Sequence, residues 1–131
     1  MKKIFFAVCL MMNLASFAQS KLPVELPVEF KTLKHSFGNV KQGVPVTTEF
    51  SFTNKSEKPV VIEVATADCG CTSPEYPKEP IMKGKTANIK VTYNAATAGH
   101  FEKNVTVKFA NISQPIILKI DGDVVAQPTK G

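Results

Sequence analysis

The residues with the clearest capacity for chemistry are two cysteines separated by one glycine, in the run Asp68-Cys69-Gly70-Cys71-Thr72. On a regular strand, residues two apart lie about 6.6 Å from each other, at the long limit for a disulfide. A bridge between these cysteines therefore needs a bend, which the glycine can supply. Because a ring this small removes little entropy from the unfolded chain, we expect such a bridge to have a purpose other than stapling the fold.

Four interpretations of Cys69 and Cys71 are open from the sequence. As thiolates they suit a soft metal ion, Cu(I), and copper is the one cofactor that the chain suggests; zinc would need further ligands, for which only His35 and His100 are available. Thiol–disulfide exchange is the second interpretation, although no cationic neighbour in the sequence activates either thiol. Intermolecular pairing or attachment is the third. The fourth is structural, with two small buried residues or a local bridge that shapes a turn.

The segment after the cysteines contains three prolines in a short stretch. Pro74, Pro77 and Pro80 surround Tyr76 and follow Thr72, a composition that predicts a stiff, extended loop. A stiff loop loses little entropy on binding, so this segment is a candidate binding loop. The alternative interpretation is a crossover between two sheets.

The elements that must position these residues are strands. From Lys31 onward apolar residues alternate with polar ones, which is the strand period rather than the helical one. Turn-forming residues recur about every ten positions, and together these patterns predict about seven short strands in one antiparallel, immunoglobulin-like β-sandwich of the all-β class. The alternating segments are 48–54, 60–64, 89–93, 105–109 and 116–120, and the expected aromatic core is Phe37, Phe50, Phe52, Tyr93, Phe101 and Phe109.

The N-terminus has the pattern of a secretory signal peptide. Lys2 and Lys3 precede an apolar run from Ile4 to Leu14, and small residues follow up to Ala18. We expect cleavage after Ala18, export to the periplasm or the medium, and a mature chain with no transmembrane segment, because the apolar run is shorter than the about 20 residues that span a bilayer.

The mature chain divides into three expected parts. Residues 19–30 contain Leu-Pro-Val-Glu twice, at 22–25 and 26–29, and this predicts an extended leader or an edge strand. The sandwich domain is expected over residues 31–125, and residues 126–131 form a C-terminal tail.

Several classes of function are disfavoured by composition. All 16 basic residues are lysine, and removal of the signal peptide lowers the net charge from +5 to +3, so no nucleic-acid partner is expected. The chain has no tryptophan, the best surface for stacking sugars, so glycan binding is not expected either. No catalytic motif is present, and we expect no catalytic residues. Asn54, Asn104 and Asn111 begin tripeptides that match glycosylation acceptors.

The sequence from His35 to Gly122 resembles the bacterial family catalogued as domain of unknown function 1573, with a Cys-Gly-Cys-Thr motif inside the matching frame. The resemblance implies an immunoglobulin-like sandwich related to the ASPM/SPD-2/Hydin and PapD-like modules, usually exported and without an established activity. The residues that carry it include Phe37-Gly38-Asn39-Val40, Phe50-Ser51-Phe52-Thr53-Asn54, Pro59-Val60-Val61-Ile62, Cys69-Gly70-Cys71-Thr72, Pro80-Ile81, Gly84, Ile89-Lys90-Val91, Gly99, Phe101 and Val105-Thr106-Val107.

These observations predict an exported, non-enzymatic binding or scaffolding module of the bacterial cell envelope with a protein partner. Unpaired backbone groups at a sheet edge bind a partner strand without catalytic residues, so the expected binding surface is a strand edge or the Cys69–Pro80 loop. The alternative prediction is a thiol-based Cu(I) or disulfide redox protein that uses Cys69 and Cys71.

Overall fold

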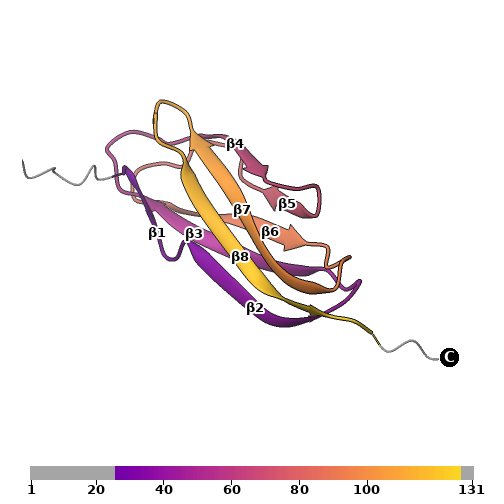
Figure 1. Cartoon of the computed structure of the whole chain (residues 1–131). Helices are drawn as coiled ribbons and strands as arrows, with labels where there is room; N and C mark the ends of the chain where they lie inside the picture. The colour runs from indigo at the N-terminus through magenta and orange to yellow at the C-terminus, as the bar shows by residue number, and fades with distance from the viewer. Residues whose placement is uncertain (1–25, 128–131) are drawn as a thin grey trace, which may run out of the picture.

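The computed structural model describes residues 26–127, which form two four-stranded β-sheets packed face to face (Figure 1). This range contains no helix, and so none long and apolar enough to cross a membrane. The predicted leader residues 19–25, the signal peptide with Ala18 and the end of the predicted tail lie outside the described residues. The strands are β1 (Val28–Phe30), β2 (Lys34–Lys41), β3 (Val46–Asn54), β4 (Ile62–Ala67), β5 (Thr72–Glu75), β6 (Thr86–Tyr93), β7 (Gly99–Phe109) and β8 (Ile116–Val125).

The strand order is β1-β3-β6-β5 in one sheet and β2-β8-β7-β4 in the other. Two details differ from the expectation of about seven antiparallel strands: the described residues form eight, and β2 runs parallel to β8. Both have the same cause. The N-terminal stretch pairs first with β3 as β1 and then, after Lys31–Leu33, crosses to the second sheet as β2.

The core forms where the inward faces of the two sheets meet, and its alternation was readable from the sequence. Phe50 and Phe52 of β3, Ile89 and Val91 of β6, and Val107 of β7 are fully or almost fully buried. Their neighbours in sequence point outward, as a period of two requires. The predicted all-β, immunoglobulin-like sandwich is therefore confirmed. Most of the expected aromatic core is buried as well, except that Phe37 is only partly buried and packs against the edge of the core.

Two segments are placed differently from the simple alternating pattern. Alternation over residues 60–64 predicts Val64 on the same face as Val60 and Ile62, but Val64 is 40% exposed because the register of β4 against β7 shifts between Ile62 and Val64. The strand β1 lies inside the segment 19–30, for which a leader or an edge strand was expected; residues 28–30 form an edge strand, and Val28 is buried against the core.

Candidate functional site

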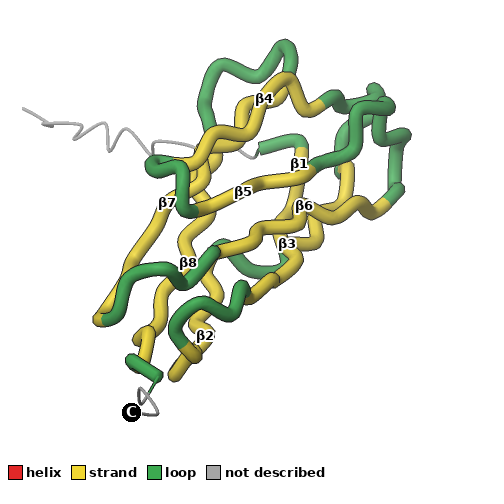
Figure 2. The backbone as a smooth tube through the Cα atoms, turned by 90° about the vertical axis from the view of Figure 1, so that its right-hand side faces the viewer, coloured by secondary structure: helices red, strands yellow, loops and turns green. Residues whose placement is uncertain are grey.

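The two cysteines lie in the turn that carries the chain from one sheet to the other. β4 is one edge strand of the second sheet and β5 is one edge strand of the first, and the two lie next to each other at one flank of the sandwich (Figures 1 and 2). Asp68 to Cys71 connect them, and a disulfide joins Cys69 to Cys71 with their Cα atoms 5.3 Å apart. The structure thus has the local bridge that was one interpretation of the pair.

Thr72 anchors this turn from within. Its side chain is buried, and its Oγ1 lies 3.7 Å from the sulfur of each cysteine. Its backbone N–H donates to the carbonyl of Cys69 at 3.4 Å, and the carbonyl of Cys71 accepts from the N–H of Asn94 at 3.0 Å. On the other side, the N–H of Asp68 donates to the carbonyl of Asn104 at 3.1 Å. The turn is therefore tied to both sheets.

The predicted binding loop does not form one exposed surface. Thr72 and Pro74 belong to β5, where they are buried and half-buried. Tyr76 and Pro77 are also half-buried, and Lys78 Nζ lies 3.8 Å from the centre of the Tyr76 ring, whereas Pro80 is exposed. The crossover between sheets lies one step earlier than expected, at Asp68 to Cys71.

Among the described residues, the fold does not assemble a set of metal ligands around the cysteine pair. A disulfide contains no thiolate, so Cu(I) binding would require prior reduction of Cys69 and Cys71. Within residues 26–127, no three side chains of histidine, cysteine, aspartate or glutamate are grouped as a metal site. His35 packs edge-on against Phe37 at 4.7 Å between ring centres, and His100 Nδ1 lies 3.0 Å from a carboxylate oxygen of Asp123.

A hollow of about 360 Å³ opens beside the disulfide. Cys71 lines it together with Tyr93, whose ring stacks on Phe101 with centres 3.9 Å apart, and with His100 and Lys103. No acidic residue is among the residues that line this hollow. We call it the Cys71 hollow.

Lys103 is the residue of this site that sequence reasoning missed. The inward face of β7 presents Phe101, Val105, Val107 and Phe109, and by the same alternation it presents Lys103. A lysine at a core-facing position of a strand breaks the apolar pattern. That break was visible in the sequence, but only the end of β4 at Ala67 shows that the lysine emerges at an open flank rather than in the core.

The edge of β5 is closed to a partner strand. The hydrogen bond from Asn94 to Cys71 and the register of β5 against β6 imply that Ser73 and Glu75 bond to β6, while Thr72 and Pro74 turn their backbone groups outward. The N–H of Thr72 is already used within the turn, and proline has no N–H. Residues 72–75 therefore offer no free donor at this edge.

The edge of β4 is open. The hydrogen bond from Asp68 to Asn104 and the register of β4 against β7 direct the backbone groups of Ala65 and Ala67 away from β7. No backbone partner outside the ladder accepts from these two N–H groups among the described residues. The strand contains no proline, and the exposed Val64 lies beside them.

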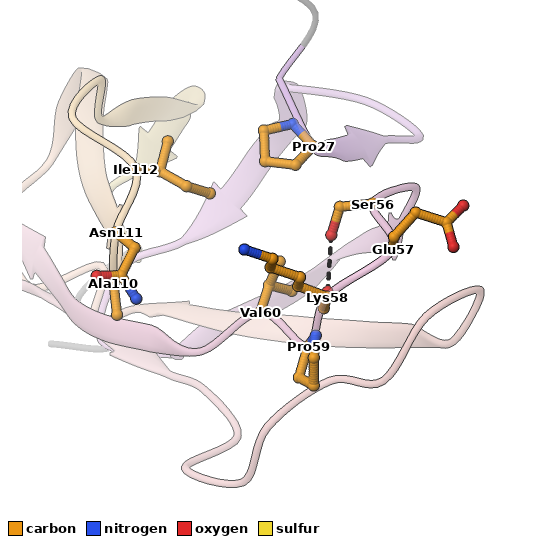
Figure 3. A pocket seen from close by; sticks show the side chains of 9 residues that line it. All are labelled: Pro27, Ser56, Glu57, Lys58, Pro59, Val60, Ala110, Asn111 and Ile112. Atoms are coloured by element: carbon orange, nitrogen blue, oxygen red, sulfur yellow. Dashed lines mark hydrogen bonds between the residues drawn. The ribbon is translucent and has the colours of Figure 1, made fainter.

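A second hollow, of about 350 Å³, lies where the β3–β4 and β7–β8 connections meet (Figure 3). Its lining includes Pro27, Pro59, Val60 and Ile112, and the only charged side chains in it come from Glu57 and Lys58. In Figure 3 the dashed line marks the hydrogen bond from Ser56 Oγ to the carbonyl of Lys58, at 2.7 Å. This hollow is more apolar than the first and contains no cysteine or histidine.

The outward face of the second sheet carries a network of charges. A hydrogen bond from Lys119, together with its positive charge, lowers the pKa of Glu102. A hydrogen bond from Ser36, followed by that from Lys34, lowers the pKa of Asp121. The hydrogen-bond partners and nearby lysines thus favour the ionised form of both carboxylates on this face of the sheet.

The three possible glycosylation acceptors differ in access. Asn54 is fully buried and uses both side-chain atoms in hydrogen bonds, so it is not an acceptor in the folded chain. Asn104 is half-buried and Asn111 is exposed.

The fold is shared with several solved structures of low sequence identity. A PapD-like domain of human CEP192 superposes with a TM-score of 0.65 at 8% identity, over 77% of this chain and 87% of that one. A protein of unknown function from Porphyromonas gingivalis W83 gives 0.65 at 10% identity, over 74% of this chain and 46% of that one. The VesB protease of Vibrio cholerae gives 0.59 at 15% identity, over 75% and 32%. These similarities establish the fold alone.

Sequence comparison identifies the family. No curated protein matches the chain. The family described as protein of unknown function (DUF1573) matches residues 28–124, which is nearly the whole sandwich from β1 to β8. The resemblance expected from the motifs between His35 and Gly122 is thus confirmed, and the chain belongs to the DUF1573 family.

Proposed function

We propose that this chain is an exported, non-enzymatic binding or scaffolding module of the bacterial cell envelope that binds an extended segment of a partner protein along β4. The open edge at Ala65 and Ala67 carries this proposal. A partner strand gains backbone hydrogen bonds there, and the exposed Val64 beside the edge supplies an apolar contact. The signal-like residues 1–18 support export.

The experiment changes one backbone donor at each edge: a new proline removes a donor at β4, and replacement of the native proline restores one at β5. In an Ala65→Pro variant the outward N–H is lost and the ring blocks an added strand, whereas no ladder bond to β7 is removed. The matched control is Pro74→Ala, which restores an N–H at the β5 edge and leaves β4 untouched. Immobilised wild-type chain and both variants are exposed to envelope extract, and retained proteins are compared by mass spectrometry.

We expect a protein that the wild type and Pro74→Ala retain and that Ala65→Pro loses. Equal retention by all three chains would overturn the assignment of β4 as the binding edge. Far-UV circular dichroism and a urea midpoint for each variant show whether the loss of partner binding is due to unfolding. A second proline on the same edge, Ala67→Pro, should cause the same loss of binding.

A second candidate function is thiol–disulfide exchange, favoured by one observation: the disulfide between Cys69 and Cys71 lies beside an open hollow that Cys71 itself lines. A double Cys→Ser variant should lose exchange with a dithiol while it keeps partner retention at β4. Cu(I) binding stays a separate prediction, tested by native mass spectrometry of the reduced chain titrated with Cu(I).

A further inference from the structure

The placement of Lys103 is the most unusual feature of the sandwich flank. It belongs to the row of β7 side chains that build the core, yet it is a cation and only partly exposed. None of the ion pairs formed within residues 26–127 involves Lys103. Keeping a lysine half-buried without an anionic partner forgoes the stability that an apolar residue would supply, and such local misfits concentrate at functional sites.

The surroundings of Lys103 are suited to a small anion. The Cys71 hollow has a volume of about 360 Å³, within the range of small-molecule sites, and no carboxylate lines it. His100, the other basic residue of the lining, is already engaged by Asp123 at 3.0 Å. The carboxylate of Asp68 accepts from the N–H of Asn104 at 3.1 Å and is not part of the lining. Lys103 is therefore the cation that a ligand in the hollow meets.

We propose that the Cys71 hollow binds thiols that carry a carboxylate, with Lys103 as the residue that holds the carboxylate while the sulfur reaches Cys71. This inference rests on the thiol–disulfide function proposed above and adds a substrate class to it. The aromatic stack of Tyr93 and Phe101 forms an apolar wall for the carbon atoms between the two functional groups.

The exchange balances with two thiols and no further reactant. The thiolate of the first attacks Cys71 Sγ, the bond between the two cysteines breaks, and Cys69 leaves as a thiolate that takes a proton from water. A second thiolate attacks the ligand sulfur of the mixed disulfide, and Cys71 leaves and is protonated. Two thiols become one disulfide, and the cysteine pair gains two electrons and two protons. The hydroxyl of Thr72, 3.7 Å from both sulfurs, is placed to donate to either leaving thiolate.

The test measures a charge preference. The oxidised chain, with Cys9 blocked beforehand wherever residues 1–18 are retained, is incubated separately with 3-mercaptopropionate, 2-mercaptoethanol and cysteamine, which differ mainly in charge. Free cysteines are trapped with an alkylating agent and counted by intact mass. The rate for the anionic thiol divided by the rate for the neutral one is compared between chains, so that the intrinsic reactivity of each thiol cancels. A peptide with adjacent aspartate and cysteine is the fourth probe.

Lys103→Gln should lower this ratio about two- to fivefold, the size expected for one partly exposed charge pair. The control Lys108→Gln, which removes the same charge from the same strand where it pairs with Glu63, should leave the ratio unchanged. Lys103→Arg should retain it. A preference that extends to the peptide assigns protein cysteines as the source of the thiol, and a preference confined to 3-mercaptopropionate assigns free thiols.

The two levels of the proposal fail differently. If exchange occurs but the ratio of the anionic-thiol rate to the neutral-thiol rate is equal in wild type, Lys103→Gln and Lys108→Gln, the carboxylate site is refuted and the redox function stands. No exchange with any of the four probes would overturn both. Urea midpoints of the variants guard against misfolding, and the preference of the wild type should itself decline with added salt.

Discussion

The fully buried side chain of Asn54, at the end of β3, offers a stringent test of what holds the β3–β4 connection. Its Nδ2 donates to the carbonyls of Lys58 and Ile81 at 2.8 and 2.9 Å. Its Oδ1 accepts from the N–H of Ser56 at 2.9 Å and lies 2.7 Å from Ser56 Oγ, whose single hydroxyl proton is shared between this oxygen and the carbonyl of Lys58, also at 2.7 Å. One side chain thus organises the turn after β3 and ties it to the bridge between Val60 and Ile81.

The magnitude for Asn54→Ala follows from these bonds. The two carbonyls keep other partners, because Val60 N–H still donates to Ile81, and in the variant the Ser56 hydroxyl is free to donate to Lys58 alone. The backbone N–H of Ser56 loses its acceptor. Each lost hydrogen bond costs about 1 kcal/mol, and the cost is smaller for the carbonyls that keep another partner. The unpaired N–H of Ser56 adds a desolvation cost. We therefore expect a loss of about 3 kcal/mol in the free energy of unfolding.

Urea unfolding followed by far-UV circular dichroism measures this loss. With a denaturant slope of about 1.5 kcal/mol/M, the midpoint should fall by about 2 M. The matched control is Asn88→Ala on the outward face of β6, where the side chain is exposed and its Oδ1 accepts from the hydroxyl of Ser51 at 2.6 Å; its midpoint should change little. A loss below about 1 kcal/mol for Asn54→Ala, or equal losses for the two variants, would refute the assignment of the turn to the Asn54 network.

Three further predictions concern the turn, the sheet packing and the charged face. Serine at both cysteines should cost at most about 1.6 kcal/mol by urea unfolding, since a three-residue loop removes little unfolded-state entropy; a loss above 3 kcal/mol would make the bridge a structural staple. Gly122→Ala should lower stability by about 1–3 kcal/mol, because its Cβ would lie 2.8 Å from the Phe101 ring and 2.9 Å from a backbone oxygen, whereas Gly70→Ala meets no atom within 4 Å and should be tolerated. Because the pKa values of Glu102 and Asp121 are lowered in the folded chain, their contribution is present above the ordinary values of 4.5 and 3.8 and is lost as the pH falls below them. Urea midpoints of wild type and Asp121→Asn between pH 6 and about 3 should converge toward the acid end, and parallel curves would contradict this linkage.

Much of the fold was predictable because its causes are local. The alternation of Phe50 and Phe52 with polar neighbours specifies which face of β3 is buried, whatever strand lies beside it. The bridge between Cys69 and Cys71 was open as an alternative for the same reason, since two residues so close in sequence meet whenever the chain bends at Gly70. Export likewise is a prediction from a contiguous segment, and it stays one.

The candidate site was less predictable because it depends on neighbours distant in sequence. In the sequence Lys103 is only an irregularity in the alternation of β7, and its place at an open flank follows from the end of β4 at Ala67, opposite Val105. The prolines of the predicted loop suggest a binding surface. The register of β5 against β6 instead directs the backbone of Pro74 to the outer edge of β5, where it offers no N–H to a partner strand.

The sequence by itself determined the class of structure, the family and the cysteine pair, because composition, period and motif spacing are properties of short stretches of chain. Only the tertiary structure decided the strand order, the parallel pairing of β2 with β8, the open edge of β4 and the union of Lys103 with Cys71 around one hollow. Register and edge exposure arise from pairing between strands far apart in sequence, and a shift of one residue between them reverses which groups face the core and which face a partner.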